Sequence, residues 1–494
     1  LHNKMLFSVL SFIGNVLMAM MNMNTPKIGV LLFSNNGLRL SGKDTPDGTY
    51  ESRMLKLEGR VLDGLKQFAN LIYTGIVYTR SDLDRAMEAF QAEKAEGVFA
   101  LYLSWAPDAN WIRFQRDMPA MPVLFASMIP ENIPFETTFS ANDSVAANTV
   151  RGLVGSLQAG GSIARIKRSM LETVLGTYDD IMEKARLFFA AANVRARLKE
   201  AVVAHISRHH EVMWSTYVDG FSLFQHVGPE VKVLAASAVR REMDSIPDSD
   251  VQAALKQLTD KYAVMDDVDM DKLAASVRSS IAMDRVAAAA GADYIVMNDL
   301  DGALHKDLGL RPGFLPCPNG HGIPATPEGD IGAGTAAYIL RILSGKPAVV
   351  VEPGYINPVT GFVDIGHGGP NDYTNPDSKV KIAKDTRLLN ADVEFPGAGF
   401  AWQVIGQGVK TMLHLSQSNG GFKMACTVVE AQDVDYFHAS FCHGRVKPLT
   451  GSPAEVFGKL LRFGTTQHYA VAPGDYRKEL AELASIMNFE YLEA

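Results

Sequence analysis

The sequence predicts an α/β fold in which two Rossmann-like α/β domains are followed by a β-rich C-terminal domain. Short apolar runs typical of buried strands alternate with helical patterns in the first part of the chain, which favours parallel sheets covered by helices. The alternation starts again after residue 200. Beyond Lys346, strand-like segments are joined by long loops rich in Gly, Pro and Asn. We therefore expect domains at 25–165, 166–346 and 347–494, behind a leader at 1–24.

The expected elements follow from these local patterns. In the first domain we expect strands at 28–33, 97–103 and 123–126 and a helix over 51–71. In the second we expect strands at 201–206, 231–235 and 294–297 and helices over 248–262 and 270–290, while 309–327 is rich in Gly and Pro and predicts little regular structure. In the third we expect strands at 348–351, 424–430 and 436–439 and a closing helix over 476–487.

The composition is that of an ordinary folded protein. Of 494 residues, 47% are hydrophobic and 21% are charged, which excludes a disordered chain. The net charge is −8 and no long Lys/Arg run is present, so we expect no binding to nucleic acid or to an anionic membrane. Cys317, Cys426 and Cys442 form no CxxC pair and are too few for a disulfide framework.

An apolar run at 5–18 leaves two hypotheses open for the leader. It is too short to span a bilayer, but it suits the hydrophobic region of a signal peptide. Alternatively, the frame is extended upstream of a true start at Met20, Met21 or Met23. We favour the second hypothesis because Leu1 is not a start residue. We expect a cytoplasmic protein, or an exported one if the run is a genuine signal peptide.

A glycine motif resembles a dinucleotide-binding fingerprint. Gly332, Gly334 and Ala337 fit GxGxxA, and Glu352 ends the next strand, where such folds place an acid that binds the ribose. A strand should run directly into the first glycine, but the residues before Gly332 include prolines and no apolar run. We therefore expect no nicotinamide cofactor and keep an oxidoreductase as a third hypothesis.

The same stretch contains residues typical of metal ligands. Glu328 precedes a predicted helix, Glu352 closes the strand AVVVE, and His367 follows the strand-like run FVDI. Two carboxylates and an imidazole suit Mn²⁺ or a similar divalent ion better than structural zinc. Taken singly, each residue also has a simpler interpretation: a charge at a helix N-terminus for Glu328, an exposed loop acid for Glu352 and a turn residue for His367.

The runs PEGDIGAGTAAYILRIL, VVVEPGY and FVDIGHGG resemble the L-arabinose isomerase family and its broader L-fucose/L-arabinose isomerase superfamily. Near the C-terminus, FGTTQHY resembles the family's Gly-x-His-His-Thr segment, of which only the second histidine, His468, is kept. The resemblance covers about 245–370 and 460–494 and is loose elsewhere.

The resemblance implies four metal ligands, Glu328, Glu352, His367 and His468, and a proton-transfer role for both glutamates. It implies a homotrimer or homohexamer and Mn²⁺-dependent isomerisation of a free sugar, with L-arabinose to L-ribulose as the first candidate. In this chemistry a divalent ion stabilises the charge that develops on O1 and O2, and carboxylates carry the proton between C1 and C2.

Two departures leave the sugar open. The family's first-domain His-Gly pair has no histidine in the matching region 142–152, and its Gly-Asp-Lys turn is missing near 217–220. An isomerase of L-fucose or of another pentose or hexose is therefore one alternative. A non-catalytic, secreted sugar-binding protein is the alternative from another class.

Other conspicuous residues predict structure more than chemistry. We expect His205, His209 and His210, which are spaced for one helical face or turn, to form a solvated patch and not a site. We assign Cys317 and His321 to a loop near the active site, and Trp105 and Trp111 to core packing in preference to sugar stacking. We expect His438, Cys442 and His443 to lie in strands and turns of the last domain.

Overall fold

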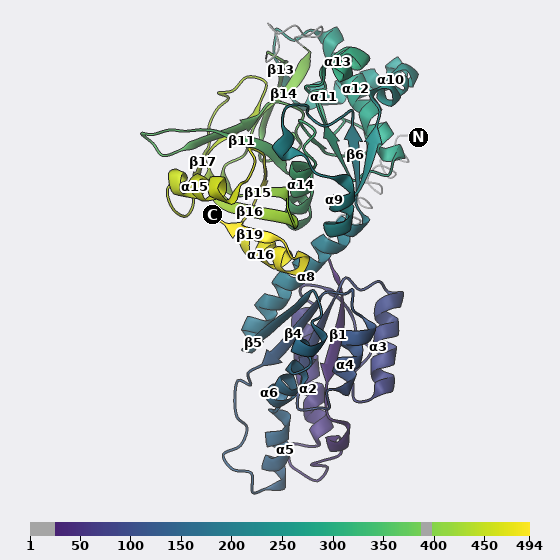
Figure 1. Cartoon of the computed structure of the whole chain (residues 1–494), viewed down its shortest axis with the longest axis vertical. Coiled ribbons are helices and arrows are strands. Elements are labelled where there is room, and N and C mark those ends of the chain that lie inside the picture. The colour runs from purple at the N-terminus through teal and green to yellow at the C-terminus, as the bar shows by residue number, and fades with distance from the viewer. Residues whose placement is uncertain (1–24, 387–397) are drawn as a thin grey trace. The chain divides into compact units, whose positions relative to one another are not determined.

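The computed structural model describes residues 25–386 and 398–494 (Figure 1). The chain divides into two compact units. One comprises the described residues up to Ala196 together with Ser485–Asn488, and the other comprises Arg197–Ala484 and Phe489–Ala494. Helices combine with two parallel sheets and a third sheet that is mostly antiparallel, which confirms the α/β class. The Rossmann-like character of the first two layers and the three-domain division stay predictions. The proposed leader at 1–24 lies outside the described residues.

The first unit is built on a five-stranded parallel sheet with the order β2-β1-β3-β4-β5. Its strands are β1 (Lys27–Phe33), β2 (Asn70–Ile72), β3 (Gly97–Tyr102), β4 (Val123–Met128) and β5 (Leu171–Gly176). Its helical elements are η1 (Asn36–Leu38), α2 (Tyr50–Leu65), α3 (Arg80–Ala92), α4 (Ala109–Asp117), α5 (Ala141–Thr149), α6 (Gly152–Gly160), α7 (Ile163–Ile166) and the first part of α8 (Tyr178–Glu200). Every residue of β3 is buried, as expected of a central strand in a sheet covered on both faces.

The two tryptophans of this unit differ in their surroundings. Trp111 is fully buried and stacks on Phe125 with ring centroids 4.5 Å apart, so the prediction of core packing is confirmed for this residue. Trp105 is 36% exposed, and its indole N–H donates to Gln158. The Trp105 side chain is therefore only partly packed against the protein, and its remaining surface faces solvent.

The second unit contains a four-stranded parallel sheet with the order β10-β9-β6-β7. Its strands are β6 (Val202–Ile206), β7 (Glu230–Leu234), β9 (Tyr294–Met297) and β10 (Ala325–Thr326). The helical elements of this layer are η2 (Trp214–Thr216), α9 (Gly220–His226), α10 (Ala236–Ser245), α11 (Asp248–Lys261), α12 (Met270–Ala289), α13 (Gly302–Leu308) and α14 (Ile331–Ser344). The predicted helices over 248–262 and 270–290 are confirmed as α11 and α12. Within 309–327 the only regular element is the short strand β10.

The same unit carries a 10-stranded sheet with the order β19-β16-β15-β18-β11-β12-β17-β14-β13-β8. Its strands are β8 (Ala263–Val264), β11 (Val349–Ile356), β12 (Val363–His367), β13 (Lys379–Lys384), β14 (Gly399–Val404), β15 (Gly408–Ser418), β16 (Gly421–Ala431), β17 (Cys442–Pro448), β18 (Tyr469–Pro473) and β19 (Glu490–Glu493). The helices α15 (Pro453–Phe463) and α16 (Arg477–Met487) follow β17 and β18 in the sequence.

Part of this sheet closes on itself. The strands β16-β15-β18-β11-β12-β17 are successively antiparallel neighbours, and β17 pairs with β16 again. The closed ring encloses a core that includes Val351, Ile365, Met412 and Val446. Closure pairs each of these strands on both sides and so leaves no free strand edge within the ring.

The predicted strand at 436–439 is wrong, since this segment is irregular. The backbone N–H of Phe437 donates to the His443 imidazole and not to a neighbouring strand. The true strand, β17, begins at Cys442 and includes His443, while His438 lies in the preceding turn. The expectation that these residues belong to strands and turns is thus confirmed.

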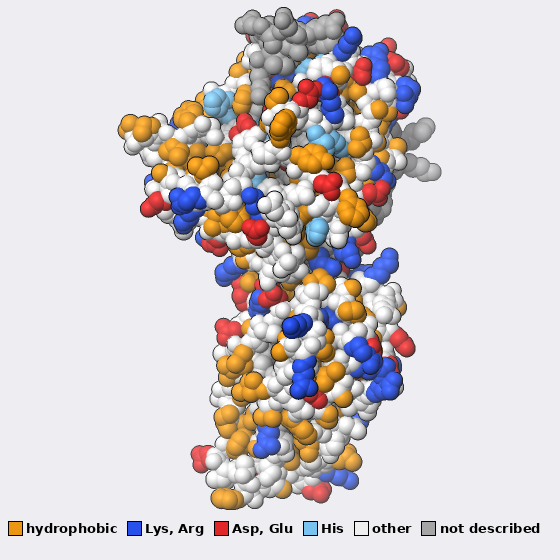
Figure 2. Space-filling model, in the orientation of Figure 1, with side chains coloured by type: hydrophobic (Ala, Val, Ile, Leu, Met, Phe, Trp, Pro, Cys, Tyr) orange, Lys and Arg blue, Asp and Glu red, His pale blue; other side chains and the backbone are white. Residues whose placement is uncertain are grey.

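Charged side chains are distributed over both units. Figure 2 shows acidic and basic groups interspersed on the viewed face of each unit. None of the helices in the described part of the chain combines the length and the apolar composition that crossing a membrane requires.

Candidate metal centre

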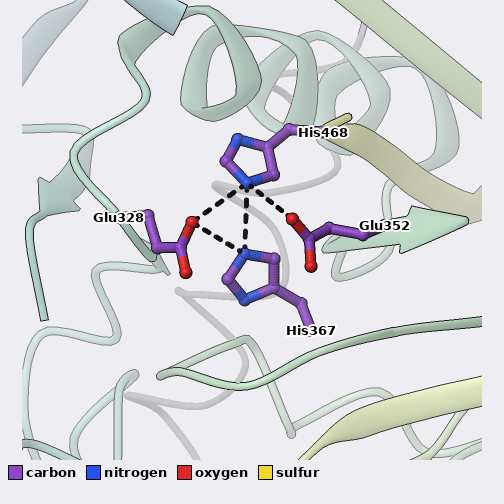
Figure 3. A group of neighbouring side chains, drawn as sticks. All are labelled: Glu328, Glu352, His367 and His468. Carbon is purple, nitrogen blue, oxygen red and sulfur yellow. Dashed lines mark hydrogen bonds and ion pairs between the residues drawn. The ribbon is translucent and has the colours of Figure 1, made fainter. Parts of the chain in front are cut away.

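Four side chains from separate segments of the second unit converge on one point (Figure 3). Glu328 lies in the turn between β10 and α14, Glu352 on β11, His367 at the end of β12, and His468 immediately before β18. One ligand atom from each residue lies within 4.8 Å of the others. The group could therefore hold a metal ion, as the sequence motifs implied.

The distances suit a divalent cation. The two imidazole Nε2 atoms are 3.2 Å apart, and Glu328 Oε2 lies 3.3 Å from His468 Nε2 and 3.7 Å from His367 Nε2. Glu352 Oε1 lies 3.6 Å from His468 Nε2. Adjacent ligands held at about 2.1 Å from one ion are about 3 Å apart. Two nitrogens this close, with two carboxylate oxygens beside them, thus form a plausible coordination shell.

Strand register explains why ligands distant in sequence meet. Glu352 pairs with Gly366, the neighbour of His367 on β12. Val351 pairs with Tyr469, the neighbour of His468 on β18. The strands β12, β11 and β18 are consecutive in the closed ring, so the backbone ladder brings the backbone positions of these three residues close together.

Burial differs among the four residues. His367, His468 and Glu328 are 0%, 1% and 4% exposed, whereas the Glu352 side chain is 34% exposed. Glu352 therefore marks the side from which a ligand can approach. The two carboxylates also supply the charge that a divalent cation neutralises.

Ion pairs between the ligands polarise the site strongly. Burial alone would raise the pKa of Glu328, but hydrogen bonds with His367 and His468 hold that pKa well below its usual range. Burial opposes protonation of His468, yet its hydrogen bonds with Asp330, Glu328 and Glu352 raise the pKa of His468 to about 11. A cation entering the site therefore replaces a proton between the same groups.

Neighbouring groups orient both imidazoles with Nε2 toward the centre. His468 Nδ1 donates to Asp330 Oδ2 at 2.8 Å, and His367 Nδ1 donates to the Gly368 carbonyl at 3.0 Å. Such outer hydrogen bonds fix the tautomer of a metal-binding histidine. Asp330 also caps α14, because its Oδ1 accepts from the Ala333 N–H.

His414 is a further supporting residue that sequence patterns did not reveal. Its Nδ1 donates to the carbonyl of His468 at 2.9 Å, and its Nε2 lies 2.9 Å from the Ser416 hydroxyl. Burial lowers the pKa of His414, which favours this neutral, hydrogen-bonded form. Its position in β15 has no local signature, because its partner His468 is 54 residues away in the sequence.

The glycines of the GxGxxA motif serve packing. A Cβ at Gly332 would overlap the carbonyl oxygen of Leu415, and one at Gly334 would lie 2.6 Å from Val296 Cγ2. Both glycines are buried within α14. They let the helix approach β15 and β9 closely, and this accounts for the motif without a pyrophosphate.

The expected solvated histidine patch is wrong for His205. This residue is 1% exposed on β6, and its ring lies 4.4 Å from that of His209. Burial lowers the pKa of His205 to about 4. The error arises because β6 is an interior strand of its sheet, so its side chains face protein. His209 hydrogen-bonds the backbone of Gly329, next to the candidate metal ligand Glu328.

The remaining candidates lie outside the group of possible metal ligands found among the described residues. Cys317 is buried, and burial raises its pKa, whereas His321 is exposed. The region 142–152, which lacks the family's histidine, covers most of α5. Asp219, in the segment that replaces the Gly-Asp-Lys turn, caps α9.

No protein-family model matches the chain, and no curated protein matches it significantly. The relation to the L-arabinose isomerase family therefore stays a prediction from the motifs.

Proposed function

We propose that this protein is a metal-dependent aldose–ketose isomerase that acts on a free sugar, with L-arabinose to L-ribulose as the first candidate. The observation that carries the proposal is the convergence of Glu328, Glu352, His367 and His468 on one point. This is the ligand set that the motif resemblance implies. Mixed carboxylate and imidazole donors with an approach from solvent favour Mn²⁺ or a related divalent cation.

The reaction moves hydrogen between C1 and C2 while O1 and O2 exchange carbonyl and hydroxyl roles. A divalent cation at this site would supply Lewis-acid stabilisation of negative charge on the two oxygens. The chain itself supplies two carboxylates on different segments, Glu328 and Glu352. Their convergence provides both proton acceptor and donor within one site.

Glu352 is placed to meet the substrate first because its side chain is 34% exposed. In the proposed reaction one carboxylate accepts the proton that leaves C2, and a protonated carboxylate returns a proton to C1. The proton of the O2 hydroxyl passes to O1, so the aldose and the ketose have the same composition. Asp330 and the Gly368 carbonyl hold the imidazoles in place during these transfers.

The residues of the site indicate the type of reaction more closely than they indicate which sugar reacts. L-fucose and other pentoses or hexoses are alternatives, because the first-domain histidine of the family is missing from 142–152. A sugar-binding protein would need no paired glutamates at a metal site, so catalysis is the better explanation of this donor set.

The test is ketose formation from a panel of aldoses, L-arabinose included, with and without added Mn²⁺. We expect turnover of at least one aldose only with metal. Glu328→Gln should reduce kcat by about 100- to 10,000-fold, whereas Glu490→Gln, at an exposed position on β19, should match the wild type. If no aldose reacts although Mn²⁺ is bound, the isomerase proposal fails and a binding function takes its place.

A further inference from the structure

Arg311, Asp299 and Asp385 form a buried ionic cluster that adjoins the proposed metal centre but contains none of its four ligands. Arg311 donates through Nε and Nη2 to Asp299 Oδ2 at 3.1 and 2.8 Å, and through Nη1 to Asp385 Oδ2 at 3.0 Å. The three residues are 2%, 0% and 4% exposed. Burying charges is costly, and apolar residues often replace a buried ion pair without loss of stability. The presence of this cluster therefore calls for an explanation other than stability.

Asp299 contacts both turns that deliver buried metal ligands. Its Oδ1 accepts a 2.9 Å hydrogen bond from the backbone N–H of Glu328. Its Oδ2 packs against Gly369, where a Cβ would lie 3.0 Å from that oxygen and 2.6 Å from Pro327 Cβ. Gly369 follows His367 by two positions. The Asp299 carboxylate thus contacts both the turn that contains Glu328 and the turn that follows His367.

The Glu328 turn needs such support because its backbone is strained. Glu328 has φ +59° and the following Gly329 has φ +70°, and a left-handed conformation costs a non-glycine residue on the order of 1 kcal/mol. The N–H of Gly329 donates to the carbonyl of Met297, and that of Glu328 donates to Asp299. Both hydrogen bonds tie the turn to the end of β9.

Arg311 determines where the Asp299 carboxylate points. The Nε and Nη2 groups of Arg311 both donate to Asp299 Oδ2, so Asp299 Oδ1 is left to accept from the backbone N–H of Glu328. The Asp299 carbonyl is fixed separately by His305 Nε2 at 2.6 Å. The guanidinium is held in turn by Asp385 and by the Phe400 ring, whose centroid lies 5.1 Å away.

We propose that Arg311 is a positioning residue of the metal centre, which acts through Asp299 to preorganise Glu328 and His367 for the cation. The inference rests on the metal site of the proposed function and is independent of the sugar. Residues that orient ligands through hydrogen bonds typically alter metal affinity by 10- to 100-fold when they are replaced. Arg311 acts one step further out, by fixing the residue that makes such a bond.

The test compares Mn²⁺ binding by the full chain and by variants, using calorimetric dissociation constants and the electron paramagnetic resonance spectrum of bound Mn²⁺. We expect Arg311→Met to weaken binding about tenfold or more and to broaden the spectrum, and Arg311→Lys to have a smaller effect in the same direction. The matched control is Arg278→Met on α12. Arg278 donates to the backbone carbonyls of Met243 and Ile246, so its loss should lower Tm and leave the Mn²⁺ dissociation constant unchanged.

Wild-type affinity and an unchanged spectrum in folded Arg311→Met would overturn the proposal. If that variant does not fold, Arg311→Lys and Asp385→Asn decide, and wild-type binding by both of them would overturn it equally. A protein that binds Mn²⁺ but isomerises no aldose would refute the proposed function while leaving this test intact.

Discussion

At the scale of single residues, a proton and the proposed cation would compete for the same groups of the candidate metal centre. In the metal-free fold the pKa of His468 is raised from 6.5 to about 11, since its hydrogen bonds with Asp330, Glu328 and Glu352 outweigh burial. The stabilisation from these contacts is fully present below pH 6.5 and is lost as the pH rises toward 11. Metal binding requires neutral His468, so it must release that proton.

We therefore expect Mn²⁺ affinity to rise with pH above 6.5, by up to about tenfold per unit. Titration calorimetry in buffers of different ionisation enthalpy should detect about one proton released per Mn²⁺ bound. Asp330→Asn removes the carboxylate 2.8 Å from His468 Nδ1, and so should flatten the pH dependence. An affinity that is constant between about pH 6.5 and 9 would contradict this account.

Local sequence patterns predict the four candidate metal ligands, but they do not predict the residues that hold those ligands in position. Glu328, Glu352, His367 and His468 lie in recognisable local motifs, although Glu352 does not close its strand as expected, because β11 continues to Ile356. His414 contacts a partner 54 residues away and Arg311 contacts Asp385 74 residues away, so no local pattern identifies these two residues. The prediction of a solvated His205 is wrong because the spacing of histidines in the sequence says nothing about burial, and the strand of His205 has a neighbour on each side.

At the scale of elements, α14 illustrates how packing overrides helix propensity. Alanine is ordinarily favoured over glycine inside a helix by about 1 kcal/mol. In Gly332→Ala, however, the new methyl group would overlap the Leu415 backbone carbonyl. We expect a net destabilisation of about 1–3 kcal/mol, measured by chemical denaturation.

Gly458→Ala on α15 is the matched control, since the nearest group to its added Cβ is the Arg462 side chain at 3.5 Å. That variant should be stabilised by about 0.5–1 kcal/mol. Equal effects of the two substitutions would show that α14 does not depend on close approach to β15.

Elements were predictable where the pattern was locally strong. The buried runs that became β1, β3 and β9 and the amphipathic helices α11 and α12 were expected at nearly their observed bounds. The strand at 436–439 failed because a side chain of β17 takes the Phe437 N–H. The sequence does not predict the closed ring, because its pairings β11–β18, β15–β18 and β12–β17 join strands far apart in the chain and leave no mark on any one of them.

At the scale of the whole molecule, the ligands come from one of the two compact units. A bound cation should therefore stabilise Arg197–Ala484 selectively. At 100 times the dissociation constant the gain is about 2.7 kcal/mol. Hydrogen exchange with mass spectrometry should show added protection on Mn²⁺ binding around β11, β12 and β18, with little change at β1–β4. Removal of Mn²⁺ by a chelator should reverse this added protection, and Glu328→Gln should abolish most of it. Uniform protection of both units would contradict a centre confined to the second.

The closed ring also sets the order of events during biosynthesis. His468 follows His367 by 101 residues, and β18 must insert between β11 and β15 before the last imidazole reaches the others. A nascent chain that has left the ribosome only as far as β17 contains Glu328, Glu352 and His367. It still lacks His468 and the strand β18 that follows it. The proposed metal binding would therefore follow assembly of the ring, and a chain on a ribosome stalled before His468 would lack one of the four candidate ligands.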